Sequence, residues 1–416
     1  MHLSREQIEK ELQGYYRTGC FHIYLKGSFR EDLENMSFDD LSTFTHEYVH
    51  YLQNISTFYG IFEANTIHQA AIETFREIET KQKITIPYNT SYSEDLLERL
   101  RWINVMNGDR VPEEGCQDII NEDYKISFFF EDYYGQYRNG RKVRVQYKTI
   151  DGIIKNRYIG ALDIKEGMAV AYQSILGELQ PHPDIPYNLL RILCKQHFPS
   201  VYNDVKKFIC ICYTSLFDLS PADFFMSLCL DDRVDNTKSG FQVFDDFIWT
   251  SPIKVKNKSV NVPYFFNQTI ETFKESIKGF LRIDTPYIDT ILDSVKLVDG
   301  NVPILNVINT EAPITVENIK ALVKVTGIPF IHAQGRGWFF PSLNGQGASD
   351  IVHMVGLTWI HVFLLQQDKA KQGICPFATI CGMCGDYCFD KPWLEDYEKC
   401  IFKLITKDLK IRDKFM

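Results

Sequence analysis

The chain has 416 residues, of which 45% are hydrophobic and 24% charged, which fits a globular protein of one large domain or two closely packed ones. Its formal net charge is −9 and no long run of Lys or Arg occurs, so the sequence predicts neither a nucleic-acid partner nor a membrane partner. The charged first ten residues do not resemble a signal peptide, and the 11 Cys are an odd number, which favours free thiols in a reducing compartment. We therefore expect a cytoplasmic protein.

A strand and a long helix are the first elements that the sequence predicts with a clear pattern. Residues 21–25 are rich in β-forming side chains and end at Gly27. The helix is expected after Ser37, because Ser37 and Asp40 have the spacing of a capping box and neither Pro nor Gly occurs between residues 36 and 59. Apolar residues occupy most of its faces, which indicates a buried helix.

This helix carries the sequence His46-Glu47-Tyr48-Val49-His50, the HExxH pattern of zinc hydrolases. Each helical residue advances about 100°, so the two histidines lie about 40° apart around the axis and one turn apart along it. Both imidazoles can therefore bind one ion. Glu47 is displaced by about 100° from His46, which keeps it out of the coordination sphere but within reach of a water molecule on the metal. The motif predicts a Zn²⁺ site with Glu47 as the general base.

Helices dominate the rest of the predicted fold. Helical periodicity resumes at 61–79, with Gly60 as the expected break, and residues 126–130, 143–147 and 157–162 are typical of strands of a small antiparallel sheet. Further helices are expected at 166–179, 187–197, 201–216, 222–230, 269–280, 316–325 and 351–365. Strand-like or irregular segments are expected at 243–266 and 302–307. The predicted fold class is α+β and helix-rich, with one domain at 1–240 and a helix-rich region carrying a Cys cluster at 241–416.

A catalytic zinc ion usually has three protein ligands, so a further residue must join the two histidines. Glu166 is the preferred candidate, because it lies where a predicted strand gives way to a helix, and Gly167 and Ala169 would let that helix approach the metal helix closely. Two competing residues lie on the intervening helix. Glu73 and His68 could face the site if that helix folds back, although neither has neighbouring small residues.

These residues resemble the gluzincin metallopeptidases, HExxH zinc enzymes whose third ligand is a glutamate on a later helix. The matching residues are His46, Glu47 and His50, together with Glu166 through its Glu-Gly-x-Ala pattern. The resemblance covers two helices only, and the subfamily stays unassigned because no Asn-Glu-x-x-Ser-Asp signature follows the metal helix. It implies a zincin-like core, with a small, mainly antiparallel sheet beside the metal helix and an edge strand that can pair with an extended peptide.

Under this interpretation, zinc-activated water attacks a peptide bond and Glu47 carries the proton to the leaving amine. The tetrahedral oxyanion then needs a second stabilising group. The candidates in the sequence are Tyr172, which follows Glu166 on the same predicted helix, and His332 and Arg336 in a segment rich in glycine and aromatic residues. For His332, a buried structural imidazole is an equally good interpretation.

Four thiols form a C-terminal cluster: Cys375, Cys381, Cys384 and Cys388. The Cys-Gly-Met-Cys-Gly portion resembles one knuckle of a structural zinc site, but the second knuckle is missing. A second, structural metal, an iron–sulfur cluster and a set of unmetallated thiols all remain consistent with this spacing.

The leading functional hypothesis is a cytoplasmic zinc metallopeptidase that acts on a protein or peptide and is restrained by narrow specificity, an occluded cleft or a regulatory partner. The alternatives are a zinc hydrolase of a non-peptide amide bond, which would use the same chemistry, and a non-catalytic interaction protein stabilised by a metal. Four protein ligands around the ion would favour the last of these.

Overall fold

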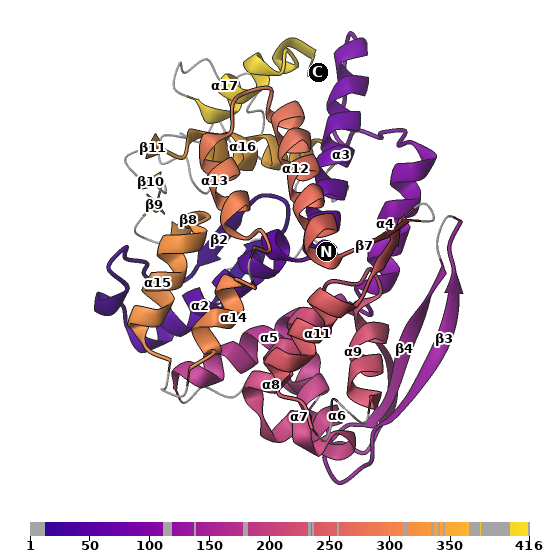
Figure 1. Cartoon of the computed structure of the whole chain (residues 1–416). Helices are drawn as coiled ribbons and strands as arrows, with labels where there is room; N and C mark the ends of the chain where they lie inside the picture. Colours follow the sequence, from indigo (N-terminus) through magenta and orange to yellow (C-terminus); the bar gives the residue numbers. More distant parts are fainter. Residues whose placement is uncertain are drawn as a thin grey trace.

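The computed structural model of the chain describes residues 13–110, 119–136, 139–177, 182–231, 234, 237–255, 258–298, 300–310, 314–333, 337–339, 342–343, 346–365, 375 and 400–414. Helices make up most of it, accompanied by small sheets (Figure 1). The helix-rich α+β class expected from the sequence is therefore confirmed. None of the helices in these residues is long and apolar enough to cross a membrane.

The first half of the described chain contains two short strands, a long pair of helices and a separate sheet. Its helices and strands are β1 (Gly14–Arg17), β2 (His22–Leu25), η1 (Leu33–Asn35), α2 (Phe38–Ser56), α3 (Phe58–Thr80), α4 (Glu94–Met106), β3 (Ser127–Tyr134), β4 (Asn139–Lys148), β5 (Ile154–Ile159), α5 (Ala161–Leu176), η2 (Asp184–Asn188), α6 (Leu189–His197), α7 (Pro199–Asn203) and α8 (Val205–Ser215).

The second half is mainly helical. Its elements are α9 (Pro221–Leu230), α11 (Gly240–Thr250), β6 (Ile253–Val255), β7 (Lys258–Val260), α12 (Val262–Leu281), α13 (Pro286–Ser294), α14 (Pro303–Ile308), α15 (Val316–Thr326), β8 (Phe330–Ala333), β9 (Gly337–Phe339), β10 (Ser342–Leu343), β11 (Gln346–Gly347), α16 (Ser349–Leu364), α17 (Ile401–Asp408) and η6 (Arg412–Lys414).

A four-stranded sheet, in the order β1-β2-β8-β9, packs against α2. The β1/β2 and β8/β9 pairs are antiparallel, whereas β2 and β8 are parallel, with Ile23 opposite Ile331. The sheet therefore combines strands from both sides of the expected domain boundary at residue 240, and that division stays a prediction. Strands β3, β4 and β5 form a second, wholly antiparallel sheet, whose long β3 and β4 strands lie along one side of the molecule (Figure 1).

The metal helix begins as the sequence predicted, since the Ser37 hydroxyl accepts a hydrogen bond from the Asp40 amide. The expected break at Gly60 is wrong, because α2 ends and α3 begins around Thr57, whose hydroxyl caps α3 by accepting from the Gly60 amide. Gly60 has another role. A Cβ there would lie 2.3 Å from the Gln53 carbonyl oxygen, so glycine permits close packing of α3 on the end of α2.

The segments 243–266 and 302–307, expected to be strand-like or irregular, are largely helical. The first contains the strands β6 and β7, but α11 occupies its beginning and the first turns of α12 its end, and α14 covers 303–308. In α11 the capping box between Ser239 and Gln242 fixes the N-terminus, and the Phe, Ile and Val side chains that suggested a strand are buried at helical spacing on one face. The helix α14 begins with Pro303, which lacks the N–H that a first helical turn leaves unpaired.

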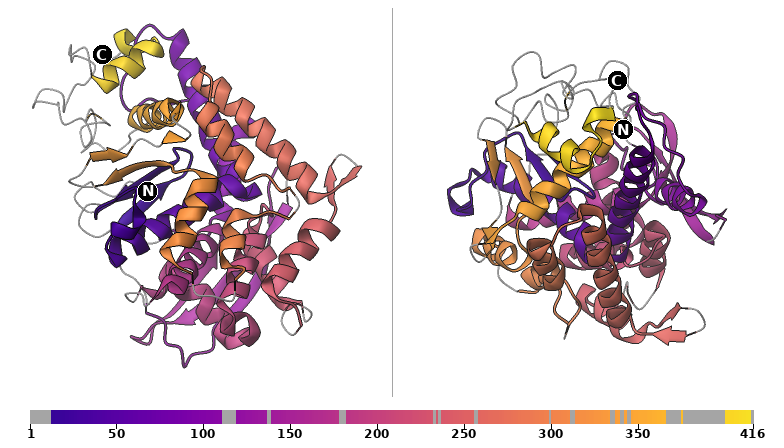
Figure 2. Two further views of the ribbon diagram at one scale, coloured as in Figure 1. Left: turned by 60° about the vertical axis from the view of Figure 1, so that its left-hand side comes forward. Right: turned by 90° about the horizontal axis from the view of Figure 1, so that it is seen from above.

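The C-terminal half also packs against the metal helix. Figure 2 shows α12 lying alongside α3, which in turn packs on α2. The chain between α15 and β8 is anchored by tyrosine hydroxyls: Tyr48 donates to the Gly327 carbonyl, Tyr51 to the Thr326 carbonyl, and Tyr287 to the Ile328 carbonyl. Gly327 has a φ of 72°, in the left-handed region that favours glycine. These bonds fix the approach of β8 to β2 beside the metal helix.

Candidate metal centre

His46, His50 and Glu166 come together on two packed helices. Nε2 of His46 lies 3.1 Å from Oε2 of Glu166, Nε2 of His50 lies 3.2 Å from the same oxygen, and the two Nε2 atoms are 3.0 Å apart. Ligand atoms around a tetrahedral zinc ion lie about 3.3 Å apart, because each bond is about 2.0–2.1 Å long. The described residues thus place three ligand atoms at a spacing that suits a metal ion.

Two buried carboxamides determine which ring nitrogens face this cluster. Nδ1 of His46 lies 2.9 Å from Oε1 of Gln173, and Nδ1 of His50 lies 2.9 Å from Oε1 of Gln53. The NH₂ group of each carboxamide fixes its orientation. Nε2 of Gln173 donates to the Ser42 carbonyl, and Nε2 of Gln53 donates to the Lys165 carbonyl. Both Oε1 atoms are therefore acceptors, so each histidine carries its proton on Nδ1.

With the protons on Nδ1, both Nε2 atoms present lone pairs to the carboxylate of Glu166. Three acceptors at 3.0–3.2 Å repel one another unless a shared proton or a metal cation lies between them. Protonating both Nε2 atoms would instead direct two N–H groups at each other. The donor set of two imidazoles and one carboxylate, with the other ring nitrogens held by hydrogen bonds, is the one that zinc takes in hydrolytic sites. The residues fit the metal that the motif predicts.

The electrostatics of the two acidic residues differ. Burial raises the pKa of Glu166, whereas imidazole N–H groups facing it in the absence of a metal would hold it below its usual range. Burial raises the pKa of Glu47 to about 8, and the negative charge of Glu166 adds to this. A cation bound by the three ligands would lower the pKa of Glu47 again, so that it could act as a base near neutrality.

The strand β1 lies directly against Glu47. The backbone amide of Tyr16 donates a hydrogen bond to the Glu47 carboxylate. A Cβ on Gly14 would lie 3.1 Å from Cγ of Glu47 and 3.0 Å from Cγ2 of Thr43. The missing side chain therefore lets β1 approach the helix, and the sheet helps to hold the carboxylate in place. The side chains of the three ligands are 9–18% exposed, so the centre is shielded but has access to solvent.

The two rival ligands lie elsewhere. Glu73 accepts hydrogen bonds from the amide and hydroxyl of Ser93 at the start of α4. The Nε2 proton of His68 is donated to the Gly19 carbonyl, and its buried ring stacks on Phe273. Gly167 also differs from its expected role. A Cβ there would meet Phe208 of α8, so this glycine does not face the metal helix.

Of the predicted oxyanion stabilisers, the two that the structure describes are engaged elsewhere. Tyr172 is fully buried and its hydroxyl donates to the Ile304 carbonyl. His332 lies on β8, with its ring 5.3 Å from that of Tyr24. Arg336 lies outside the described residues. Of the thiol cluster, Cys375 is buried with its thiol outside any disulfide, while Cys381, Cys384 and Cys388 lie outside the described residues.

Two side chains that the sequence did not single out do lie beside the ligands. The ring of His182 is 6.2 Å from that of His46, and the ring of Tyr187 is 6.1 Å from the same imidazole. Burial raises the pKa of Tyr187, and the charges of Glu166 and Glu47 raise it further, which keeps its hydroxyl protonated. Burial and the neighbouring His46 lower the pKa of His182. His182 precedes η2 and Tyr187 lies within it. No motif in the sequence indicates that this segment lies near the site.

A cavity of about 1260 Å³ lies between α3, α4, α9, α11 and α12. It is separate from the candidate metal centre, because His46, His50 and Glu166 do not line it. Its walls are rich in phenylalanine, including Phe62, Phe224 and Phe247. Comparison with known proteins adds no assignment, because no family model, curated protein or solved structure matches the chain.

Proposed function

We propose that this protein is a zinc-dependent metallopeptidase whose metal is held by His46, His50 and Glu166. The observation that carries the proposal is the convergence of three lone-pair ligands, 3.0–3.2 Å apart, beside the buried carboxylate of Glu47. Among the described residues the cluster has three protein ligands rather than four, which favours a catalytic site over a structural one. A bound zinc ion supplies a Lewis acid that acidifies water and polarises a carbonyl group.

The chain's own residues would perform the proton transfers. Glu47 takes the proton of the attacking water and returns it to the leaving amine, while the Tyr16 amide keeps its carboxylate oriented. Among the described residues, Tyr187 and His182 lie close enough to His46 to donate hydrogen bonds to the oxyanion. They replace Tyr172 in this proposed role, because the Tyr172 hydroxyl is occupied by the Ile304 carbonyl.

A peptide substrate is favoured by the arrangement of β1. This strand ends the four-stranded sheet among the described strands and runs past Glu47. An extended chain that pairs with such an edge would pass beside the proposed base, and its backbone would supply most of the affinity. We accordingly propose a zincin-like core and a protein or peptide substrate, and prefer peptide bonds to other amides for this reason.

Glu47→Gln tests the proposal, because it keeps the shape of the side chain and removes the base. The purified protein should bind one Zn²⁺ and generate new N-termini in a peptide library analysed by mass spectrometry. Glu47→Gln should retain zinc and lose turnover by at least a thousandfold. Glu73→Gln is the matched control and should cleave normally. Wild-type protein that binds no zinc, or a Glu47→Gln variant that still cleaves, would contradict the proposal.

A further inference from the structure

Next to the metal centre, α3 and α5 are joined by an ion pair that is shielded from solvent. Nζ of Lys165 lies 2.5 Å from Oε2 of Glu63, and both side chains are only 12% exposed. The other carboxylate oxygen of Glu63 accepts from Nδ2 of Asn107, whose Oδ1 accepts from the Tyr59 hydroxyl. The ring of Tyr59 also lies 5.2 Å from the ammonium group. Each charge therefore has two partners, and together the contacts join α3 to α5 and to the C-terminal cap of α4.

This network continues to the metal ligands. Lys165 directly precedes Glu166, and its carbonyl oxygen accepts a hydrogen bond of 3.1 Å from the Gln53 amide group. Gln53 in turn accepts the Nδ1 proton of His50. The network thus fixes Lys165, the residue before Glu166. Through the Lys165 carbonyl it also fixes Gln53, whose carboxamide orients His50.

Stability alone does not account for such a pair. Taking two charges out of water costs about as much as their attraction returns, so a buried pair adds little net stability compared with apolar side chains. What a buried pair does supply is a defined arrangement, because breaking it leaves an uncompensated charge. Here the pair defines how α5 is positioned against α2 and α3. The proposed ligands lie on α2 and α5, together with the carboxamides of Gln53 and Gln173 that orient them.

We propose that the Glu63–Lys165 pair is a positioning device for the metal centre. By tying α5 to α3, it holds Glu166 in place and, through the Lys165 carbonyl and Gln53, keeps Nε2 of His50 directed at the same point. Neither Glu63 nor Lys165 belongs to the group of three ligand atoms. The inference rests on the proposed zinc site, and it adds that the site depends on a charge pair outside the coordination sphere.

Two single substitutions distinguish positioning from simple electrostatics. Removing a positive charge near a cation should strengthen cation binding, and removing a negative one should weaken it. If the pair acts only through its charges, Lys165→Met and Glu63→Gln must change the zinc affinity in opposite directions. If it positions the ligands, both must weaken zinc binding, by about tenfold to a hundredfold, the usual effect of losing a group that supports metal ligands. The double variant should then be no worse than either single one, because the pair acts as a unit.

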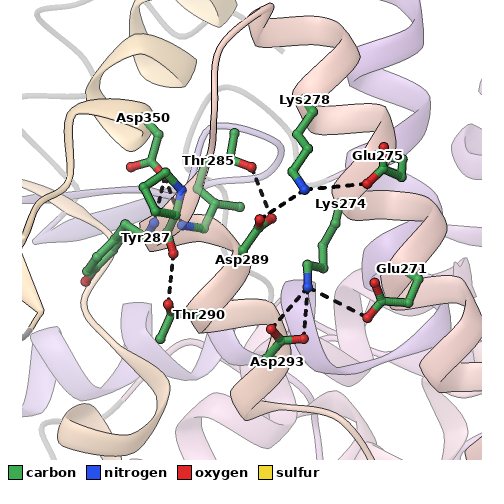
Figure 3. Close-up of polar contacts among 12 residues, drawn as sticks. Glu271, Lys274, Glu275, Lys278, Thr285, Tyr287, Asp289, Thr290, Asp293 and Asp350 are labelled. Atoms are coloured by element: carbon green, nitrogen blue, oxygen red, sulfur yellow. Dashed lines mark hydrogen bonds and ion pairs between the residues drawn. The ribbon is translucent and has the colours of Figure 1, made fainter.

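Zinc affinity is measured by competition with a chromogenic chelator, and the d–d spectrum of the Co²⁺-loaded protein reports the geometry of the ligands. Lys274→Met is the matched control. Lys274 is similarly shielded, with a 10% exposed side chain, and lies 3.0 Å from Asp293, but on α12 and α13 (Figure 3). The Lys274→Met substitution should leave the zinc affinity and the Co²⁺ spectrum unchanged even if it lowers the thermal stability of the protein. Opposite shifts in the two single variants, or affinities within twofold of a zinc-binding wild type, would overturn the inference. Wild-type protein without zinc affinity would overturn the proposed site itself.

Discussion

The Nδ1 proton of His46 is donated to Oε1 of Gln173 across 2.9 Å, and this bond fixes the nitrogen that His46 presents to the metal cluster. Gln173 is held in turn through its amide group, which donates to the carbonyl and hydroxyl oxygens of Ser42 on α2. A neutral carboxamide thus orients the ligand without adding charge. Its oxygen accepts from His46 and its nitrogen donates to Ser42, one turn earlier on α2, so the position of Gln173 depends on how α5 packs on α2.

Gln173→Leu should therefore weaken zinc binding by about tenfold to a hundredfold. The leucine fills a similar volume but cannot accept the Nδ1 proton, so the ring of His46 is free to rotate or to change tautomer. Competition with a chelator measures the change. Gln69→Leu is the control, because Gln69 is half-buried and its side chain is also hydrogen-bonded, to Ser276, but it is not one of the residues around His46, His50 and Glu166. Equal zinc affinity in the two variants would exclude the orienting role of Gln173.

The three residues that converge, His46, His50 and Glu166, could be predicted from sequence because their signal is local. The spacing of His46 and His50 is a property of one helix, and the Glu-Gly-x-Ala pattern marks Glu166. The supporting carboxamides have no motif of their own. A weaker signal exists, since Gln53 lies three residues after His50 and Gln173 seven after Glu166, positions that share a helix face with the ligand. A polar side chain at such a position on an otherwise buried helix needs a partner.

Long-range pairing is the part that the sequence could not supply. Strand β8 joins β2 although some three hundred residues separate them, as in the pairing of Ile23 with Ile331. The alternation in β8 is too short to specify a partner. For the same reason Tyr187 and His182 were missed, because their place beside His46 depends on how η2 returns to α2. The helix at 243–250 was missed because β-forming side chains outweighed the capping box of Ser239.

A second prediction concerns acid stability. Burial lowers the pKa of His68 to about 4 from an unfolded value of 6.5, and the nearby His361 behaves in the same way. Between these pH values the unfolded chain binds protons that the native state does not, so stability is complete above pH 6.5 and falls as the pH drops towards 4. At pH 5 each histidine should cost about 2 kcal/mol relative to pH 7.

His68→Gln isolates one of these contributions. Glutamine can still donate to the Gly19 carbonyl but has no group that titrates in this range. The variant loses ring stacking on Phe273 and should be less stable at every pH, but its free energy of unfolding should fall by about 2 kcal/mol less than that of the wild type between pH 7 and pH 5. Urea denaturation with a chelator present removes the contribution of the metal. Parallel pH profiles for the two proteins would contradict the assignment.

The last prediction separates the two tyrosines that have been considered for the oxyanion. Tyr187→Phe removes a hydroxyl beside the ligands and should lower kcat by about a hundredfold to a thousandfold, with zinc affinity unchanged. KM should change little, because the hydroxyl is expected to bond the transition state rather than the bound peptide. Tyr172→Phe loses only the hydrogen bond to the Ile304 carbonyl, so it should cost about 1 kcal/mol of stability and leave kcat unchanged. The reverse result would restore Tyr172 as the stabilising group, and equal losses of kcat would mean that neither hydroxyl acts on the oxyanion.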